Sequence, residues 1–347
     1  MPRRPILVDL DQPLTGQRCF ISAWLVPAPG ADGGTGWLLV DPGPPSTADV
    51  LLRALQARGV ERLELVLLTH VHLDHAGATS AVLQRYPEAR VAVHERGREH
   101  LLDPERLWHG SLRVLGPVAE VYGRPRPVPA AALATGDELA ACGVRTVPTP
   151  GHAAHHQSFV HGDTLYVGEA AGTYLDEEAE GFAAALPEAV RGAGTGTEPG
   201  AGFYLRPATP PRFFPGAALG SLERLIGLDP APRHVAFAHH GLHTGDTRAL
   251  LAAARDQLLA WLETAREEAR DHLARIAAAG TDAAPAPLSP QDLAAFAERT
   301  AARLRSVDPH FRRIDRLPPD IREREEQFTL QTLLGILDHL ERTAAAA

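Results

Sequence analysis

The segment from Thr69 to Gly77 carries side chains that could perform metal-dependent chemistry. It follows the apolar run 65–68 and reads Thr69-His70-Val71-His72-Leu73-Asp74-His75-Ala76-Gly77. His70 and His72 alternate along an extended segment, so their imidazoles can face the same side. Histidine nitrogen and carboxylate oxygen are ligands for zinc, iron or manganese, and a catalytic site keeps one coordination position for water. The spacing predicts two adjacent metal sites rather than a solvated, histidine-rich loop.

Further candidate ligands occur later in the chain, each at the end of a run with strand-like composition. The run 144–151 leads to His152, the run 164–168 leads to Glu169, and the run 234–238 leads to His239 and His240. In open α/β folds the ends of several strands gather at one sheet edge, where ligand sites form. We therefore expect an α/β protein that brings these side chains together at such an edge.

Five motifs occur in an order that is typical of one family. They are Val40-Asp41-Pro42-Gly43, His70-x-His72-x-Asp74-His75, Pro150-Gly151-His152, Gly168-Glu169 and Ala238-His239-His240-Gly241. In these motifs the chain resembles the metallo-β-lactamase superfamily of metallohydrolases, over roughly residues 5 to 265. The runs 152–156, 168–172 and 204–210 look most like a prokaryotic subgroup related to glyoxalase II and lactonases. The resemblance implies a four-layer αββα sandwich of two mixed β-sheets.

The resemblance also implies a ligand set for two divalent metal ions, zinc first, with iron or manganese as alternatives. The set is His70, His72 and His152 for one ion, Asp74, His75 and a late histidine for the other, and the residue at Glu169. The late ligand is His239 on a Thr-His-aromatic-Gly alignment and His240 on a Gly-His-Gly alignment. We prefer His239, which leaves His240 in the pocket or beside the ligands. The family usually has a bridging aspartate at Glu169, and the longer glutamate could bridge both ions or bind one.

Two metal ions at this place predict a hydrolase. A metal ion lowers the pKa of bound water to about 7, and the resulting metal-bound hydroxide would cleave a carboxylic ester, thioester or lactone. Asp74 would bind one ion and orient the attacking water, which makes it the catalytic residue. Asp41 is expected to orient a ligand or the histidine loop, or alternatively to cap a turn. The competing functions are an iron-dependent oxygen or sulfur oxidoreductase of the same fold, a phosphodiesterase, and a non-catalytic metal-binding protein.

Three further residues are candidates for the pocket. His156 follows His152 closely enough to reach the mouth of the site. Tyr204 and Arg206 lie in a Pro- and Gly-rich insertion, 195–215, and such loops commonly shape pockets. Arg206 could bind a substrate carboxylate through two hydrogen bonds. The alternative for both insertion residues is an ordered surface loop.

Composition restricts the function classes. The 347 residues, with 44% hydrophobic and 22% charged side chains, are enough for one large globular domain and an appendage. A net charge of −9 argues against a nucleic-acid partner. No apolar export segment or membrane-spanning run is seen, so we predict a cytoplasmic protein that acts on a small molecule away from membranes. Cys19 and Cys142 show no pairing pattern and are predicted to be buried thiols.

The predicted elements alternate around the ligand motifs. We expect a hairpin of 20–26 and 37–40, a helix capped by Ser46 that runs to Arg58, and helical segments at 77–86 and 98–115 on either side of extended residues 90–93. A second set of strands is expected to start near Glu138 and to turn at 161–163, followed by a helix at 218–228.

The remainder of the chain has helical character. Leu251, Ala254 and Leu258 repeat at helical spacing, residues 280–288 form an Ala/Pro linker, and Ser289-Pro290 is typical of a helix start. Two further helices are expected at 291–306 and 320–343, the latter with an apolar stripe through Leu330, Leu333, Leu334 and Leu337. We predict a catalytic domain at 1–270 and a C-terminal helical extension at 281–347. The extension packs on its own domain or, alternatively, covers the pocket or forms a homodimer contact.

Overall fold

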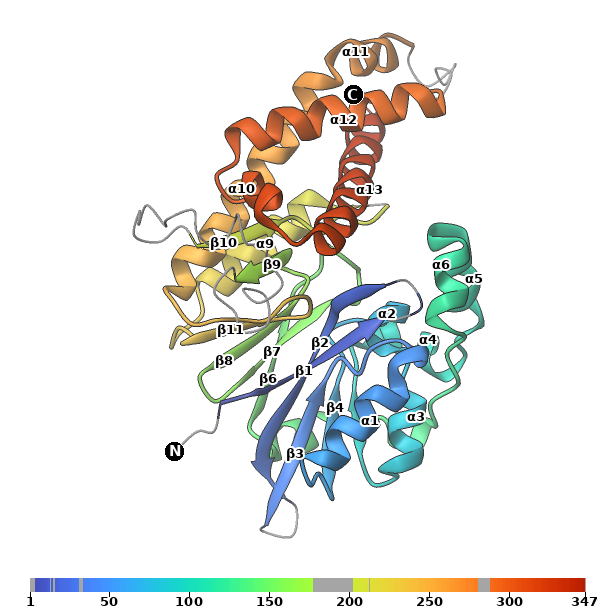
Figure 1. Ribbon diagram of the computed structural model, residues 1–347, viewed down its shortest axis with the longest axis vertical. Coiled ribbons are helices and arrows are strands. Elements are labelled where there is room, and N and C mark those ends of the chain that lie inside the picture. The colour runs from blue at the N-terminus through green and yellow to red at the C-terminus, as the bar shows by residue number, and fades with distance from the viewer. Residues whose placement is uncertain are drawn as a thin grey trace. The chain divides into compact units, whose positions relative to one another are not determined.

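The computed structural model describes residues 4–12, 14, 16–30, 34–176, 202–211, 213–279 and 288–346. These residues form two compact units (Figure 1). The first unit comprises 1–150, 154–170 and 227–247, and the second comprises 151–153, 171–226 and 248–347. Residues 280–287 of the predicted linker and 195–201 of the predicted insertion lie outside the described residues.

The first unit contains a five-stranded sheet in the order β1-β2-β3-β4-β5. Its strands are β1 (Ile6–Gln12), β2 (Gln17–Pro29), β3 (Thr35–Val40), β4 (Leu63–Leu67) and β5 (Arg90–Ala92). The first two pairings are antiparallel, which confirms the hairpin predicted from 20–26 and 37–40. The pairings of β4 with β3 and with β5 are parallel, so this is a mixed sheet.

The first unit also contains a second five-stranded sheet, in the order β12-β11-β8-β7-β6. Its strands are β6 (Val144–Pro148), β7 (Gln157–His161), β8 (Thr164–Gly168), β11 (His234–Phe237) and β12 (Leu242–His243). Strands β8 and β11 are parallel and the other neighbours are antiparallel. The hairpin predicted to turn at 161–163 is the β7–β8 pair, and its presence is confirmed.

The two sheets pack face to face through one apolar cluster. Members from the first sheet are Trp24, Val26, Leu38, Val40, Leu65 and Leu67, and members from the second are Val144, Phe159, Tyr166 and Ala236. Burying one such large side chain contributes about 1.5–3 kcal/mol. Two hydrogen bonds of 2.8 Å also join the sheets, from the Trp24 indole N–H to the Phe237 carbonyl and from the Ser22 amide to the Ala238 carbonyl.

Helices cover the other face of the first sheet (Figure 1). They include α1 (Ala48–Ala57), α3 (Thr79–Arg85), α4 (Arg98–Leu102), α5 (Glu105–Leu115) and α6 (Pro117–Tyr122). Leu51 and Leu55 of α1 are fully buried in the core on this face, as the sequence predicts. The mixed sheets and their helices confirm the predicted α/β fold class.

Two local predictions in this unit are wrong. Ser46 lies inside a short 3-10 turn, Pro45–Thr47, and its hydroxyl accepts a hydrogen bond from the Gln12 side-chain Nε2 at 2.7 Å instead of capping α1. Glu138 begins no strand, because it forms a capping box with Thr135 at the start of helix α7 (Gly136–Ala141). Of the two free cysteines, Cys142 is buried as predicted and Cys19 is partly exposed.

The second unit is mainly helical and has its own core. It contains the pair β9 (Thr173–Asp176) and β10 (Phe203–Arg206), and the helices α9 (Pro215–Ile226), α10 (Thr247–Glu268), α11 (Arg270–Ala279), α12 (Pro290–Val307) and α13 (Pro319–Ala345). Trp261, Leu304 and Phe311 are fully buried in this core. None of the described helices has the length and apolar character needed to cross a membrane.

The C-terminal helices begin largely where the sequence predicts. Ser289 caps α12 by accepting a hydrogen bond from the Asp292 amide, with Pro290 at the first helical position. On α13, Leu333 and Leu337 are buried, whereas Leu330 and Leu334 are 39% and 37% exposed, so the predicted stripe is only partly covered. The domain division at 270–281 and the homodimer contact stay predictions.

Candidate metal centre

Strand direction explains how residues far apart in the sequence reach one place. Asp41 follows β3 and His70 follows β4, and these two strands are parallel. Glu169 follows β8 and His239 follows β11, which are also parallel. The candidate ligands therefore lie at the carboxyl ends of strands, where α/β folds place their sites.

His152 comes from the loop after β6. Strand β6 runs in the same direction as β8, because each is antiparallel to β7. His152 belongs to the segment Gly151–Ala153, which is grouped with the second unit. The residues on both sides of it, Pro150 and Ala154, belong to the first unit. Chain connectivity therefore keeps His152 at the same strand ends.

The histidine motif spans the end of a buried strand and a short helix. Thr69 and His70 have no exposed surface, and His72 is the residue before helix α2 (Leu73–Ala76). Asp74 and His75 lie within that helical turn, so the chain changes from extended to helical between the first two histidines and the last. The motif is divided between two groups of candidate ligands, with the extended part in one and the helical part in the other.

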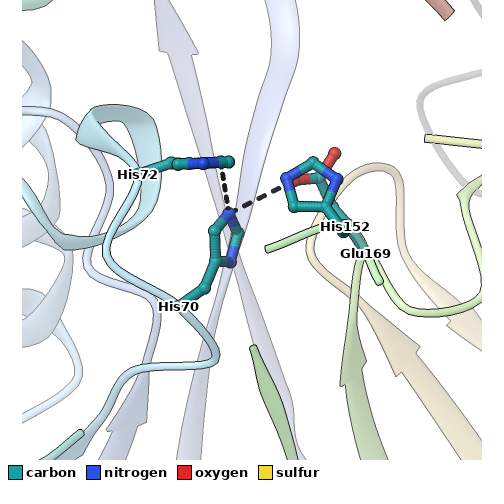
Figure 2. Close-up of side chains that lie close together, drawn as sticks. All are labelled: His70, His72, His152 and Glu169. Carbon is teal, nitrogen blue, oxygen red and sulfur yellow. Dashed lines mark hydrogen bonds and ion pairs between the residues drawn. The ribbon is translucent and has the colours of Figure 1, made fainter. Parts of the chain in front are cut away.

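The first group consists of His70, His72, His152 and Glu169, whose ligand atoms all lie within 4.8 Å of one another (Figure 2). The His70 Nε2 atom is 3.0 Å from His72 Nδ1 and 3.4 Å from Glu169 Oε2. Figure 2 shows His70 and His72 on one loop, facing His152 and Glu169, which come from other segments.

The second group consists of Asp74, His75 and His239, again within 4.8 Å of one another. The His75 Nε2 atom is 3.5 Å from Asp74 Oδ2 and 3.4 Å from Glu169 Oε2. The His239 Nε2 atom is 3.6 Å from Glu169 Oε1. The Glu169 carboxylate therefore contacts histidines of both groups.

In four of these histidines a hydrogen bond on one ring nitrogen directs the lone pair of the other toward the cluster. Nδ1 of His75 lies 3.3 Å from Asp41 Oδ2, that of His239 lies 2.7 Å from the Phe20 carbonyl, and that of His152 lies 3.1 Å from the Ala208 carbonyl. In a neutral ring, an Nδ1–H donated to an acceptor leaves Nε2 with its lone pair. Metal-binding histidines are anchored in this way.

The fourth of these histidines is anchored through Thr69. The Thr69 hydroxyl donates to Asp41 Oδ2 at 2.7 Å, so it accepts from Nδ1–H of His70 at 3.1 Å. Asp41 also accepts from the Thr69 amide at 2.9 Å. It is 1% exposed and has a φ of +49°, an uncommon conformation for a residue with a side chain. Asp41 thus orients one histidine of each group, one directly and one through Thr69.

The residues fit a divalent cation. Nε2 of His75 is buried without a hydrogen-bond partner among the described residues, and it faces two carboxylates. Burial alone would lower the pKa of His75, but the charge of Asp74 and the hydrogen bonds to Asp41 and Glu169 outweigh it and raise this pKa well above 6.5. The carboxylates thus favour a positive charge at Nε2, which a proton supplies in the metal-free protein and a metal ion would supply in its place. Two ligands bound to one zinc at about 2.0–2.1 Å in tetrahedral geometry are about 3.3–3.4 Å apart. The separations from Glu169 Oε2 to His70 and His75, both 3.4 Å, match that value.

The remaining predicted residues lie outside both groups. His240 is 6% exposed, with its ring centre 6.3 Å from that of His239. His156 is fully buried, with its ring centre 5.1 Å from that of His70. Of the two alternatives for the last ligand, the structure brings His239 into a group.

The prediction of a loop around Tyr204 and Arg206 is wrong, because both residues are buried in strand β10. Arg206 Nε donates to Glu325 at 2.9 Å, and its other two nitrogens donate to Pro207, Thr332 and Thr173. The Tyr204 hydroxyl donates to Glu325 at 3.1 Å. These contacts stabilise the second unit, and a role for Arg206 in binding a substrate carboxylate has no support in them.

Sequence reasoning missed the partners that orient the ligands. Thr69 directly precedes the histidine motif, and its position between strand and first histidine was a usable signal. The carbonyl groups of Phe20 and Ala208 carry no such signal, because every residue has a carbonyl group.

Comparison with known proteins identifies the family. A family model described as the Metallo-beta-lactamase superfamily matches residues 16–259. The chain belongs to this superfamily, whose members are generally hydrolases.

Individual relatives match only part of the chain or have low sequence identity. A metallo-beta-lactamase fold-containing protein of Sulfurisphaera tokodaii is 30% identical over 192 residues, which is 53% of this chain and 62% of that protein. The hydroxyacylglutathione hydrolase of a Synechococcus species is 35% identical over 83 residues, 23% of this chain and 32% of that enzyme. A metallo-beta-lactamase family protein from Thermus thermophilus has a similar fold, with a TM-score of 0.56 and 20% identity over 98% of this chain and 93% of that one. The chain thus matches less than two thirds of either sequence relative's length.

Proposed function

We propose that this protein is a binuclear metal-dependent hydrolase, with zinc as the first candidate, that cleaves a carboxylic ester, thioester or lactone in a small molecule. The observation that carries the proposal is the position of Glu169. Its Oε2 atom is 3.4 Å from Nε2 of both His70 and His75, and its Oε1 atom faces His239. A carboxylate between two groups of imidazole nitrogens is suited to bridging two cations, and this position supports Glu169 as a bridging residue despite its extra methylene group.

Bound divalent ions would acidify a water to a pKa of about 7 and polarise a carbonyl oxygen. The side chains of the protein would hold the two ions in place. His70, His72 and His152 would hold one ion, Asp74, His75 and His239 the other, and Glu169 both. Asp41 keeps His70 and His75 in the tautomer that binds metal.

Asp74 is the residue we propose to act on the attacking water. Its side chain is 23% exposed, against 11% for Glu169 and 0% for His75, so it is the most accessible of these three. A carboxylate at the open side of the centre can accept a hydrogen bond from water and fix the direction of attack. The similarity to hydroxyacylglutathione hydrolase supports an acyl substrate. The predicted cytoplasmic location remains part of this proposal.

The test combines metal analysis with turnover. Protein purified without added metal would be analysed for zinc, iron and manganese, in parallel for the native chain, His70→Ala and Glu169→Asp. The same samples would be assayed on an aryl ester, an acyl thioester, a lactone and a phosphodiester, before and after chelation.

We expect about two zinc ions per native chain, turnover of at least one acyl substrate, loss of that turnover on chelation and its recovery with zinc. His70→Ala should lose both metal and turnover. Predominant iron without hydrolysis would move the oxidoreductase alternative to the front. Turnover of the phosphodiester alone would contradict the acyl substrate.

A further inference from the structure

His156 is a fully buried imidazole next to the centre that neither ligand group uses. It has no exposed surface, and it is held in place by its neighbour Gln157. The Gln157 amide donates to the Thr69 carbonyl at 2.8 Å and its side chain donates to the Leu68 carbonyl at 3.1 Å. These bonds fix the start of β7 against the end of β4. They keep the His156 ring beside His70, with 5.1 Å between ring centres.

The hydrogen bonds of His156 have only one consistent direction. The Glu169 amide N–H donates to His156 Nε2 at 3.1 Å, so Nε2 carries the lone pair and Nδ1 carries the proton. Nδ1 therefore donates to the Thr149 hydroxyl at 2.8 Å.

The chain of hydrogen bonds continues in the same direction. The Thr149 hydroxyl, which accepts from His156, donates to the Ser158 hydroxyl at 3.0 Å. The Ser158 hydroxyl in turn donates to the Val167 carbonyl at 3.2 Å. That carbonyl is two residues before Glu169 on the same strand end. We call this chain of hydrogen bonds the His156 relay. It begins at the Glu169 amide, directly after β8, and ends at the Val167 carbonyl within β8.

The backbone at this point is shaped around the His156 ring. Gly168 has a φ of +59°, and a Cβ atom there would lie 2.6 Å from His156 Nε2 and 2.8 Å from the Thr69 Cβ atom. Only glycine fits both the conformation and the space. The chain turns at this glycine, and the next residue is Glu169.

We propose that His156 is a positioning residue for the metal centre: as a neutral acceptor it fixes the Glu169 amide, and so aims the longer carboxylate between the two ligand groups. This inference rests on the proposed function and deepens it. The relay ends on a fixed backbone carbonyl, so the ring is held in the tautomer that accepts from Glu169. His156 binds no metal in this arrangement, because its lone pair is occupied by the amide.

The experiment compares two substitutions that each keep half of the ring's hydrogen bonding. His156→Gln places an acceptor oxygen near the position of Nε2, and His156→Asn keeps only a donor near the position of Nδ1. Metal affinity would be measured by competition of zinc with a chromophoric chelator, and stoichiometry by elemental analysis. We expect His156→Asn to weaken binding of at least one ion by about 10–100-fold and His156→Gln to recover much of that loss.

The control is His161→Asn, the same substitution at the far end of β7, for which we expect native metal binding. Folded His156→Asn protein with native affinity for both ions would overturn the proposal, and so would a loss of equal size in the Gln and Asn variants. A purely structural histidine would give no rescue by the acceptor.

A second measurement does not require any His156 variant to fold. Nitrogen-15 NMR of the native, metal-free protein would assign the tautomer of His156. We expect an unprotonated Nε2 and a protonated Nδ1, and a mixed tautomer in Thr149→Val. A ring protonated on Nε2 in the native protein would overturn the proposal. If the native protein binds no metal while this tautomer is found, the proposed function fails and the relay assignment stands, so the two failures are distinguishable.

Discussion

Each unit of the molecule holds a cluster of ionisable side chains around a glutamate, and the two clusters are built in opposite ways. In the second unit the Glu325 carboxylate is met by donors, namely the Arg206 guanidinium and the Tyr204 hydroxyl. In the first unit the Glu169 carboxylate is met by the Nε2 atoms of three histidines. Partners on the other nitrogen leave these Nε2 atoms with lone pairs.

The difference lies in whether donors and acceptors balance. Around Glu325 a cation, an anion and hydroxyl groups satisfy one another, and burial together with the charge of Glu325 raises the pKa of Tyr204 well above 10, so the hydroxyl stays a donor. Around Glu169, acceptors face acceptors, an arrangement that is unfavourable without a cation. A buried cluster of acceptors therefore indicates a ligand site, whereas a balanced one indicates structure.

The largest expected effect is on turnover and concerns Asp74, which lies in the cluster around Glu169. Asp74→Asn keeps the size of the side chain and removes the carboxylate that we propose orients the attacking water. We expect turnover of the best acyl substrate to fall by about 10²–10⁴-fold, with the midpoint of thermal unfolding of the metal-free protein nearly unchanged. Steady-state kinetics and thermal denaturation measure the two effects. Native turnover in a fully metal-loaded Asp74→Asn protein would contradict the assignment.

The next largest effect is on the free energy of unfolding and concerns the cluster around Glu325. Glu325→Ala would leave the Arg206 guanidinium buried without its carboxylate, because Arg206 is 4% and Glu325 1% exposed. We expect a loss of about 3–5 kcal/mol in the free energy of unfolding, measured with denaturant, and no change in metal affinity of the protein that remains folded.

The matched control for that prediction removes both charges. Arg206→Met combined with Glu325→Leu replaces the ion pair by apolar side chains of similar size, and such replacements are often neutral or stabilising. We expect the double variant to be clearly more stable than Glu325→Ala alone. If the two were equally unstable, the loss would come from packing and not from an uncompensated charge.

These two clusters also show what the sequence could predict. The ligand motifs lie close together in the chain or end strand-like runs, so their spacing was enough to predict an α/β protein and to propose His70, His72 and Glu169. The two mixed sheets were implied by the family resemblance. Arg206 was misplaced because its partner Glu325 is 119 residues away in the sequence. The residue types in the run 203–206 do not indicate that a distant carboxylate will pair with Arg206.

Local helix signals gave mixed results for a related reason. Ser289 was predicted correctly, because a serine cap followed by proline depends only on its own neighbours. Ser46 also precedes a helical run, but without a following proline, and the side chain of Gln12, 34 residues earlier, donates to its hydroxyl. Glu138 shows the opposite error, since its pairing with Thr135 was a local signal that we did not use. Long-range contacts decide where local preferences compete.

Substitution of Asp41 tests how this residue supports both ligand groups, and its expected effect on metal affinity is smaller than the effects above. In Asp41→Asn the amide nitrogen cannot accept the proton of His75 Nδ1, so this ring can turn its proton toward the cluster. We expect metal affinity to fall by about 10–100-fold, measured by chelator competition, with a smaller loss of turnover at saturating zinc. Unchanged affinity would mean that Asp41 serves the strained turn at φ +49° and not the ligands.

The smallest expected effect tests whether the second unit can be weakened without disturbing the metal centre. Ser289→Ala removes the hydroxyl that accepts from the Asp292 amide at 3.2 Å. Loss of such a cap costs about 1 kcal/mol, measured with denaturant. Ser306→Ala is the control, because this exposed serine on the same helix donates only to the Arg303 carbonyl among the bonds described, and we expect a change within about 0.5 kcal/mol. Native zinc affinity in Ser289→Ala would show that the balanced cluster and its helices set stability while the acceptor cluster sets metal binding. A parallel loss of zinc affinity would instead show that the two clusters are energetically coupled.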